Sequence, residues 1–320
     1  MLGSILFAIV AAFGIAAEQT EMLPATATEP SLLLRHMRGN GPSVIYIHGA
    51  TFPSGSSMFY RIDGRSWADD LAARGFDVWA FDFAGYGGSD RPAAMREAVG
   101  APIGRTEEAV PQIERVVRHV LRERGGDKVI LLAHSWGTIP AGAFAAEHPE
   151  LVQSLILFGA VAQREGVRTP TQVPALQVSE DDQWQSFQSG VPAGEESPIN
   201  KAIFAAWAKD YLATDKASDS TTPPSVRVPS GAQADIGDAW SGKFPYDPSR
   251  VRVPTLLVRG AWDPVTKDAD AAWLVAHLSN VPGGARDIVL PRGAHRMHLE
   301  TNRQALFDAV GEYLLAAPKG

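Results

Sequence analysis

The chain has 320 residues, of which 45% are hydrophobic and 20% charged, a composition typical of a globular protein with a large core. The formal net charge of −7 and the lack of any block of consecutive Lys or Arg argue against a nucleic-acid-binding surface. The absence of cysteine excludes disulfides, thiolate nucleophiles and Cys-ligated metals. The eight histidines show no metal-ligand spacing such as HExxH, so we expect no metal and no cofactor.

The N-terminal segment Leu2 to Ala17 carries no charge and is typical of the apolar part of a secretory signal peptide. Small residues at 14–16 fit a cleavage site, and the segment is shorter than the ~20 residues of a membrane span. No Lys or Arg precedes the apolar run, so an uncleaved anchor or a mistaken start codon remain alternatives. We predict a signal peptide at 1–17 and an exported, periplasmic or secreted protein, with a cytoplasmic protein as the alternative. Residues up to about Pro30 are excluded from the predicted fold.

After this leader the chain alternates between predicted strands and helices. Strands are expected at 31–38, 43–47 and 76–82, and helices at 66–74 and 106–124. Ser66 is the expected cap of the first helix, and Gly75 is its expected end. The glycine-rich stretch 83–92 has neither a dinucleotide-binding fingerprint nor a P-loop lysine, so we interpret it as a turn.

The stretch Lys128 to Gly137 has the clearest functional signal. Val129 to Leu132 is a short, uniformly apolar run that favours a strand buried on both faces of a parallel sheet. Ser135 follows where the strand must turn, and the small apolar residues 137–146 favour a closely packed helix. This pattern predicts a nucleophile elbow, although Ala133 stands where the G-x-S-x-G motif has its first glycine. The alternative is that Ser135 only caps the helix.

The second half of the chain interrupts this alternation once. A strand is expected at 154–159, and residues 162–248 are then richer in Pro, Ser, Asp and Gln, with one clear helix at 199–212. We predict that 162–248 is an inserted, mostly helical cap. Strands at 254–259 and 286–290 and helices at 268–278 and 302–316 restore the pattern. The sequence therefore predicts an α/β core, at 31–161 and 249–317, with a mainly parallel sheet and helices on both faces.

Three residues with complementary chemistry follow predicted strands of this core. A serine hydroxyl is a poor nucleophile at neutral pH and needs a histidine base, which a carboxylate orients. The chain supplies Ser135, Asp263 and His295 in that order. Because ligands of parallel sheets bind at the carboxyl ends of the strands, we expect the three side chains to meet there.

The chain also offers other acids and bases. Three aspartates are interpreted as structural, because one precedes the serine and two begin a helix, where negative charge is favourable: Asp82, Asp268 and Asp270. His298 is an alternative to His295, although His295 follows the small pair Gly293-Ala294 that a turn needs. His48 and His134 are interpreted as structural neighbours of the site.

Several segments together resemble serine hydrolases of the α/β-hydrolase fold, in the branch that carries a cap. The matching segments, in order, are HG at 48–49, DFAGYGGSDRP at 82–92, AHSWG at 133–137, GAWDPVT at 260–266 and GAHRMHLE at 293–300. The resemblance implies that Ser135 is the nucleophile, that His295 is the general base and then acid, and that Asp263 orients the histidine. It also implies an oxyanion hole made by the backbone N–H groups of Ala50 and Trp136.

The resemblance narrows the expected chemistry. Haloalkane dehalogenases and epoxide hydrolases of this fold use an aspartate at the elbow, so the serine disfavours those reactions. We expect a carboxylic-ester hydrolase that forms an acyl-enzyme on Ser135. The alternatives are cleavage of an amide, a lactone or a carbon–carbon bond, acyl transfer, or a non-catalytic binding module.

The predicted cap carries aromatic residues that either line an apolar pocket or hold the cap on the core; the candidates for the pocket are Trp184, Trp207 and Trp240. No paired Arg or Lys suggests a clamp for a charged substrate, which favours a neutral or aromatic small-molecule ester. The sequence does not predict an oligomeric state.

Overall fold

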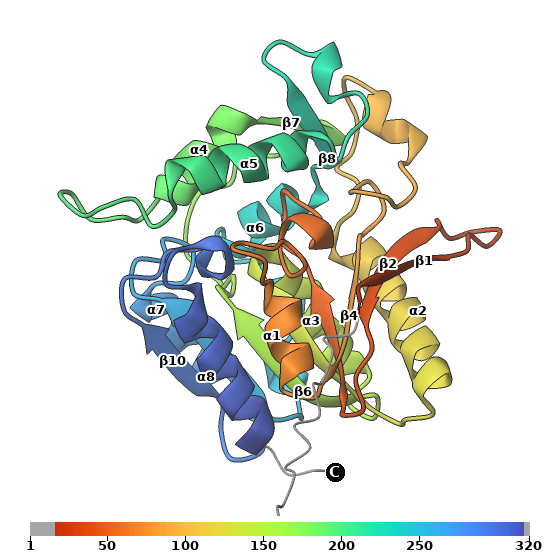
Figure 1. Ribbon diagram of the computed structural model, residues 1–320, viewed down its shortest axis with the longest axis vertical. Helices are drawn as coiled ribbons and strands as arrows, with labels where there is room; N and C mark the ends of the chain where they lie inside the picture. Colours follow the sequence, from red (N-terminus) through yellow and green to blue (C-terminus); the bar gives the residue numbers. More distant parts are fainter. Residues whose placement is uncertain (1–16, 317–320) are drawn as a thin grey trace, which may run out of the picture.

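The computed structural model describes residues 17–316, and its centre is one eight-stranded sheet (Figure 1). The strands lie in the order β1-β2-β4-β3-β5-β6-β9-β10. Their bounds are β1 (Gln19–Leu23), β2 (Leu32–Met37), β3 (Ser43–Ile47), β4 (Asp77–Phe81), β5 (Val129–His134), β6 (Val152–Phe158), β9 (Thr255–Gly260) and β10 (Arg286–Leu290). Strand β2 runs antiparallel to β1 and β4, and the pairs from β4 to β10 are parallel. The prediction of a mainly parallel sheet is therefore confirmed.

Helices cover both faces of this sheet, as predicted. They are α1 (Trp67–Ala73), α2 (Thr106–Arg124), α3 (Thr138–Glu147), α7 (Asp268–His277) and α8 (Arg303–Ala316). Because side chains alternate along a strand, Ile45 and Ile47 of β3 join a core with α2, α3 and α7. Val44 and Tyr46 point to the other face and join a second core with α1 and α8. The sheet is therefore buried on both sides, which explains the uniformly apolar central strands.

The sequence predicted the ends of these helices to within one or two residues. Ser66 caps α1 through a capping box with Asp69, and the chain leaves α2 at Gly125 in the left-handed conformation, with φ 67°. Helix α2 has the predicted bounds. Strand β6 begins two residues earlier than predicted, and β5 continues to His134.

The N-terminal region corrects one expectation. Residues before Pro30 were excluded from the predicted fold, but β1 pairs with β2 at the edge of the sheet. Its side chains are mostly exposed, so it lacks the apolar pattern of the central strands. Glu18, just before β1, forms ion pairs with Arg35 and Arg61 at 2.7 and 2.9 Å. The predicted signal peptide, apart from Ala17, lies outside the described residues and stays a prediction.

Between β6 and β9 the chain leaves the large sheet, and we call residues 162–248 the inserted segment. It contains β7 (Ala175–Ser179), α4 (Glu180–Gln188), α5 (Lys201–Leu212), β8 (Ser225–Pro229) and α6 (Gly231–Ala239). Strands β7 and β8 pair only with each other, and the sequence predicted only α5 of these elements. Helices α4 and α5 lie above the large sheet in Figure 1, whereas α6 lies lower and packs near α2 and the elbow after β5.

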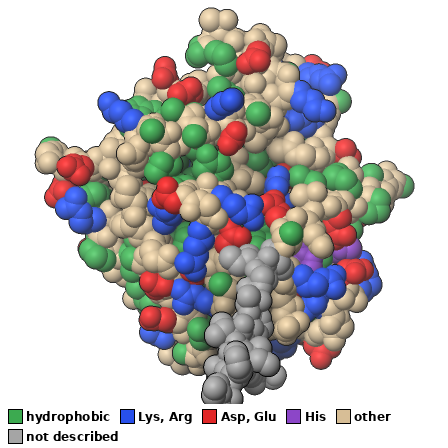
Figure 2. Space-filling view, in the orientation of Figure 1, with side chains coloured by type: hydrophobic (Ala, Val, Ile, Leu, Met, Phe, Trp, Pro, Cys, Tyr) green, Lys and Arg blue, Asp and Glu red, His purple; other side chains and the backbone are tan. Residues whose placement is uncertain are grey.

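The surface shows mixed charges. On the face in Figure 2, Lys and Arg side chains are interspersed with Asp and Glu, and neither sign forms an extended patch. Within residues 17–316, every helix is too short or too polar to cross a lipid bilayer.

Candidate active site

The carboxyl end of β5 forms the sharp turn that the sequence predicts. Ser135 is the first residue of a short 3-10 turn, η3 (Ser135–Gly137), and its φ of 56° lies in the left-handed region that residues other than glycine rarely adopt. A side chain at Gly137 would collide with the backbone carbonyl of His48, so the turn needs a glycine there. Ala133, in contrast, is fully buried and fits inside the strand. The strained turn holds the Ser135 hydroxyl at the edge of the sheet.

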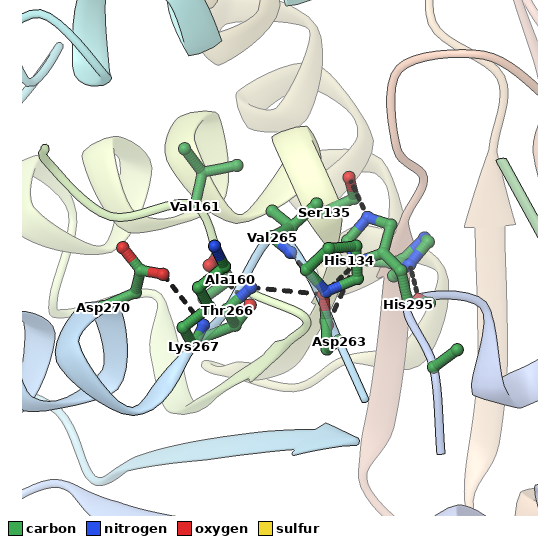
Figure 3. A network of polar contacts seen from close by, with 12 residues as sticks. His134, Ser135, Ala160, Val161, Asp263, Val265, Thr266, Lys267, Asp270 and His295 are labelled. Carbon is green, nitrogen blue, oxygen red and sulfur yellow. Dashed lines mark hydrogen bonds and ion pairs between the residues drawn. The ribbon is translucent and has the colours of Figure 1, made fainter. Parts of the chain in front are cut away.

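Ser135, His295 and Asp263 come together in one hydrogen-bonded chain (Figure 3). His295 Nε2 lies 2.8 Å from Ser135 Oγ, and His295 Nδ1 lies 3.0 Å from each carboxylate oxygen of Asp263. A proton on Nδ1 suits the carboxylate, which leaves Nε2 free to accept the serine proton. These are the distances that general-base catalysis requires.

The loop after β9 keeps Asp263 ionised. The carboxylate accepts hydrogen bonds from the backbone amides of Val265 and Thr266, at 2.8 and 3.2 Å. Burial alone would raise the pKa of Asp263, but the neighbouring His295 and these hydrogen bonds hold that pKa below its usual value. Asp263 is therefore an acceptor that fixes the orientation of the imidazole.

Gly159 leaves the space that this pair occupies. It follows β6 directly and has a φ of 58°. A Cβ atom at this position would lie 3.0 Å from His295 Nδ1 and 3.1 Å from Asp263 Oδ2. The sequence did not single out this glycine, because many strands end at a glycine and the contact joins three distant segments.

The loop after β3 orients a backbone amide beside the serine. His48 Nε2 accepts from the Phe83 amide at 3.0 Å, so its Nδ1–H donates to the Gly49 carbonyl at 2.8 Å. Burial lowers the pKa of His48, which favours this neutral form. In a trans peptide the N–H points away from the C=O, so His48 directs the Ala50 N–H to the opposite side. Within residues 17–316 this amide has no acceptor.

Gly49 and Tyr86 hold the same loop close to Ser135. A Cβ atom at Gly49 would lie 3.0 Å from Ser135 Cβ, so the loop passes directly beside the serine. The Tyr86 hydroxyl donates to the Ala50 carbonyl at 2.7 Å. The Ala50 backbone is thus held on both sides, which suits a preorganised donor.

Trp136 is tied to the inserted segment through a buried carboxylate. Its indole N–H donates to Asp235 Oδ2 of α6 at 3.0 Å, and the Thr106 amide and hydroxyl donate to the same oxygen at 2.8 and 2.7 Å. Arg105 donates to the other oxygen at 2.8 Å. Asp235 therefore joins α6, the start of α2 and the elbow. Its partners are about 100 or more residues away in the chain, so no local pattern marked it.

The other aspartates have the structural roles that the sequence suggested. Asp82 accepts from the Ser54 and Gly88 amides at 2.9 and 3.1 Å and so shapes the two loops beside it. Asp268 begins α7 and forms an ion pair with Arg259, whereas Asp270 accepts from the Lys267 amide at 2.8 Å at the start of that helix.

Two other histidines lie beside His295. His134 Nε2 contacts the backbone carbonyl of His295 at 2.9 Å, so it supports the loop that carries His295. His298 is buried among rings of the core, 4.7 Å from His134 and 6.4 Å from Trp67 between centroids. Neither of its ring nitrogens has a hydrogen-bond partner within the described residues. Ser135 is therefore bonded to His295 and not to His298.

The three tryptophans predicted for the pocket lie in different surroundings and do not line one common surface. Trp207 of α5 is fully buried, packs at 5.4 Å against Phe52 of the core, and donates to the Ser56 carbonyl at 2.8 Å. Trp184 of α4 is partly exposed and packs on Phe204. Trp240 lies beneath the Arg164 guanidinium, 4.3 Å from the ring centroid. Of the three, Trp207 is the one that contacts the loop after β3, which lies beside Ser135.

Ser135 and His295 are mostly buried. Ser135 and His295 are 8% and 7% exposed. A surface cavity of about 970 Å³ lies elsewhere, between the glycine-rich loop and the end of α5, and neither residue lines it. In the described part of the chain, no cluster of three His, Asp or Glu side chains is placed to hold a metal ion.

The comparisons with known proteins agree on the fold and differ in activity. Over 120 residues the chain is 33% identical to a probable 1-acylglycerol-3-phosphate O-acyltransferase of Oryza sativa subsp. japonica, a match that covers 38% of this chain and only 25% of that protein. It is 24% identical to a probable proline iminopeptidase of Leptolyngbya boryana, over 96% of this chain and 97% of that protein.

Solved structures and a family model extend this likeness to most of the chain. A serine hydrolase involved in carbazole degradation superposes with a TM-score of 0.64 at 19% identity, over 93% of this chain and 99% of that one. The family model described as alpha/beta hydrolase fold matches residues 42–301. The resemblance inferred from the motifs is thereby confirmed, and the chain belongs to the α/β-hydrolase-fold family.

Proposed function

We propose that the protein is a serine hydrolase that cleaves a carboxylic ester through an acyl-enzyme on Ser135. The observation that carries this proposal is the hydrogen-bonded chain from Ser135 through His295 to Asp263, at 2.8 and 3.0 Å. This arrangement supplies a nucleophile, a base within reach of its proton and a group that orients the base.

The reaction has two halves. His295 Nε2 takes the hydroxyl proton while Ser135 Oγ attacks the ester carbonyl, and the backbone amides of Ala50 and Trp136 stabilise the oxyanion. His295 then gives the proton to the departing alkoxide oxygen, which leaves as the alcohol. A water molecule, deprotonated by His295, attacks the acyl-enzyme and releases the carboxylic acid and free Ser135.

We propose further that the inserted segment acts as a cap over this site. Support comes from the low exposure of Ser135 and from the hydrogen bond between Asp235 of α6 and Trp136, beside the nucleophile. A covered site excludes water and strengthens electrostatic interactions with the transition state.

The same three residues also serve other acyl chemistry. Amide hydrolysis and acyl transfer are the main alternatives, because one relative is a probable iminopeptidase and another a probable acyltransferase. Of these reactions, ester hydrolysis requires the fewest catalytic groups, because His295 alone can protonate the leaving alkoxide. Lactones and carbon–carbon bonds are further alternatives. A non-catalytic binding module would have no need of the strained Ser135 or of its bonded base.

Matched esters and anilides of short acyl chains test this proposal. The wild-type protein should hydrolyse the 4-nitrophenyl esters, and Ser135→Ala should lower kcat by roughly 10⁶-fold, toward the uncatalysed rate. Ser154→Ala is the matched control, since Ser154 is also buried but its hydroxyl has no partner within residues 17–316. Turnover of anilides but not of esters would favour an amidase, and full activity in Ser135→Ala would contradict the proposal.

A further inference from the structure

One buried cation near the proposed nucleophile forms no ion pair within the described residues. Arg296 directly follows His295 and is only 6% exposed. Its Nη2 makes one long contact, 3.4 Å, with Gln183 Oε1 of α4, and its Nε has no partner within the described residues. Burial lowers the pKa of Arg296 to about 10, so the guanidinium still carries its charge at neutral pH.

Arg259 is a buried arginine with a structural role, and it provides a comparison for Arg296. It is also 6% exposed, but it lies 2.7 Å from Asp268 and 2.9 Å from Asp287. An unpaired charge is costly to bury, which is why buried arginines usually have carboxylate partners. Arg296 departs from this rule, although stability alone would favour an apolar side chain of the same size.

The two carboxylates near Arg296 are engaged elsewhere. Asp263 is bonded to His295 and to two backbone amides. Glu300 accepts from the Ala294 amide at 2.9 Å, and burial raises its pKa to about 7, so it is a weak counter-ion at neutral pH. The guanidinium forms no ion pair with either of them within residues 17–316.

The position of the guanidinium suits contact with a substrate. It lies 5.7 Å from the ring centroid of Phe52 and 5.2 Å from that of Phe187 in α4. Phe52 belongs to the same loop as Ala50. Arg296 follows His295 in the chain, so their Cα atoms are about 3.8 Å apart. The charge therefore lies between the loop beside Ser135 and the inserted segment.

We propose that Arg296 binds a carboxylate on the substrate, so that the protein acts on esters that carry a negative charge. This inference rests on the proposed serine hydrolase function. The planar guanidinium fork matches a carboxylate with two parallel hydrogen bonds, and a carboxylate would supply the missing counter-charge. The assignment differs from the neutral ester that the sequence favoured, because a single arginine after the histidine gave no sign of a clamp.

Two esters that differ only at the end of the acyl chain provide the test. The 4-nitrophenyl ester of valeric acid ends in a methyl group, and the mono-4-nitrophenyl ester of glutaric acid ends in a carboxylate. Wild-type protein should prefer the glutarate ester in kcat/KM. Arg296→Gln should lower kcat/KM for that ester by roughly 10- to 100-fold, mainly through KM, and change the valerate ester less than about threefold. Arg296→Lys should keep part of the preference.

Lys209→Gln is the control for net charge, because Lys209 is an exposed residue of α5. It should leave the ratio between the two esters unchanged. An equal ratio in wild type and Arg296→Gln would overturn the assignment and make Arg296 a contact between the inserted segment and the core. Thermal unfolding of each variant shows whether it folds.

A measurement on the wild-type protein alone remains decisive if the variants do not fold. Free glutarate should slow the labelling of Ser135 by a fluorophosphonate at lower concentrations than glutaramide, its neutral analogue. Equal protection, or none from either compound, would overturn the carboxylate assignment. Failure of the fluorophosphonate to label Ser135 at all would instead contradict the proposed function, so the two failures are distinguishable.

Discussion

Replacing Gly159 by alanine tests whether the pairing of His295 with Asp263 controls activity. The new methyl group would lie 3.0 Å from His295 Nδ1 and 3.1 Å from Asp263 Oδ2. Ordinary van der Waals contact needs about 3.5 Å, so the methyl group must displace both side chains by several tenths of an ångström. Their hydrogen bonds, at 3.0 Å, would then approach the length at which such bonds weaken.

Two separable effects follow from this substitution. The backbone effect comes from the φ of 58°, which costs an L-residue about 1–2 kcal/mol of stability. The site effect comes from a misplaced base. Complete loss of the carboxylate function costs about 10⁴-fold in a serine protease, and a misplacement of about 1 Å costs about 10²-fold. We therefore expect kcat to fall by roughly 100-fold.

Gly125→Ala separates the two effects. Gly125 ends α2 with a φ of 67°, and a Cβ atom there would meet no atom within 4 Å. Both variants should lose about 1–2 kcal/mol in urea unfolding, but only Gly159→Ala should lose ester hydrolysis and rapid fluorophosphonate labelling. Equal kcat in the two variants would refute the view that the His295–Asp263 contact limits the reaction.

Three further predictions concern the groups around the site. Asp263→Asn should lower kcat by about 10⁴-fold with little change in KM, and an unchanged kcat in steady-state assays would remove Asp263 from the mechanism. Asp235→Asn should destabilise the fold by about 2 kcal/mol in thermal unfolding, because a buried charged acceptor is lost, and should lower kcat about 10-fold through Trp136; normal kcat would separate the indole contact from catalysis. Glu300→Gln should change the pH dependence of stability. The pKa of Glu300 is raised from 4.5 to about 7 in the folded state, so its contribution to stability is complete below about pH 4.5 and is lost as the pH rises through about 7. At about 1.36 kcal/mol per pH unit, wild type should lose roughly 3 kcal/mol more than Glu300→Gln between pH 4.5 and 7 in urea unfolding, and parallel curves would contradict this.

The sequence predicted the elements whose cause is local. The buried strands, the capped helix after Ser66 and the end of α2 at Gly125 follow from apolar runs, a capping box and a left-handed glycine. Strand β1 was missed because an edge strand exposes its side chains and has no apolar pattern. Strands β7 and β8 were missed because they pair only with each other, within a segment of mixed composition.

The site residues that the order of residues along the chain marks were predictable, whereas those that depend on long-range contacts were not. The order of serine, aspartate and histidine after strand ends marked the three residues that the structure brings together. Gly159, Asp235 and Arg296 were not marked. Each matters through contact with a residue far along the chain, and an arginine without an ion pair in the described residues differs from a paired one only in the folded protein.

The most direct test of the account is the intact mass of the protein after treatment with a fluorophosphonate, compared between wild type and Ser135→Ala. An activated serine predicts one adduct on the wild-type protein and none on the variant. Well-folded wild-type protein without an adduct, or an adduct that persists in Ser135→Ala, would contradict the assignment of Ser135 as a nucleophile.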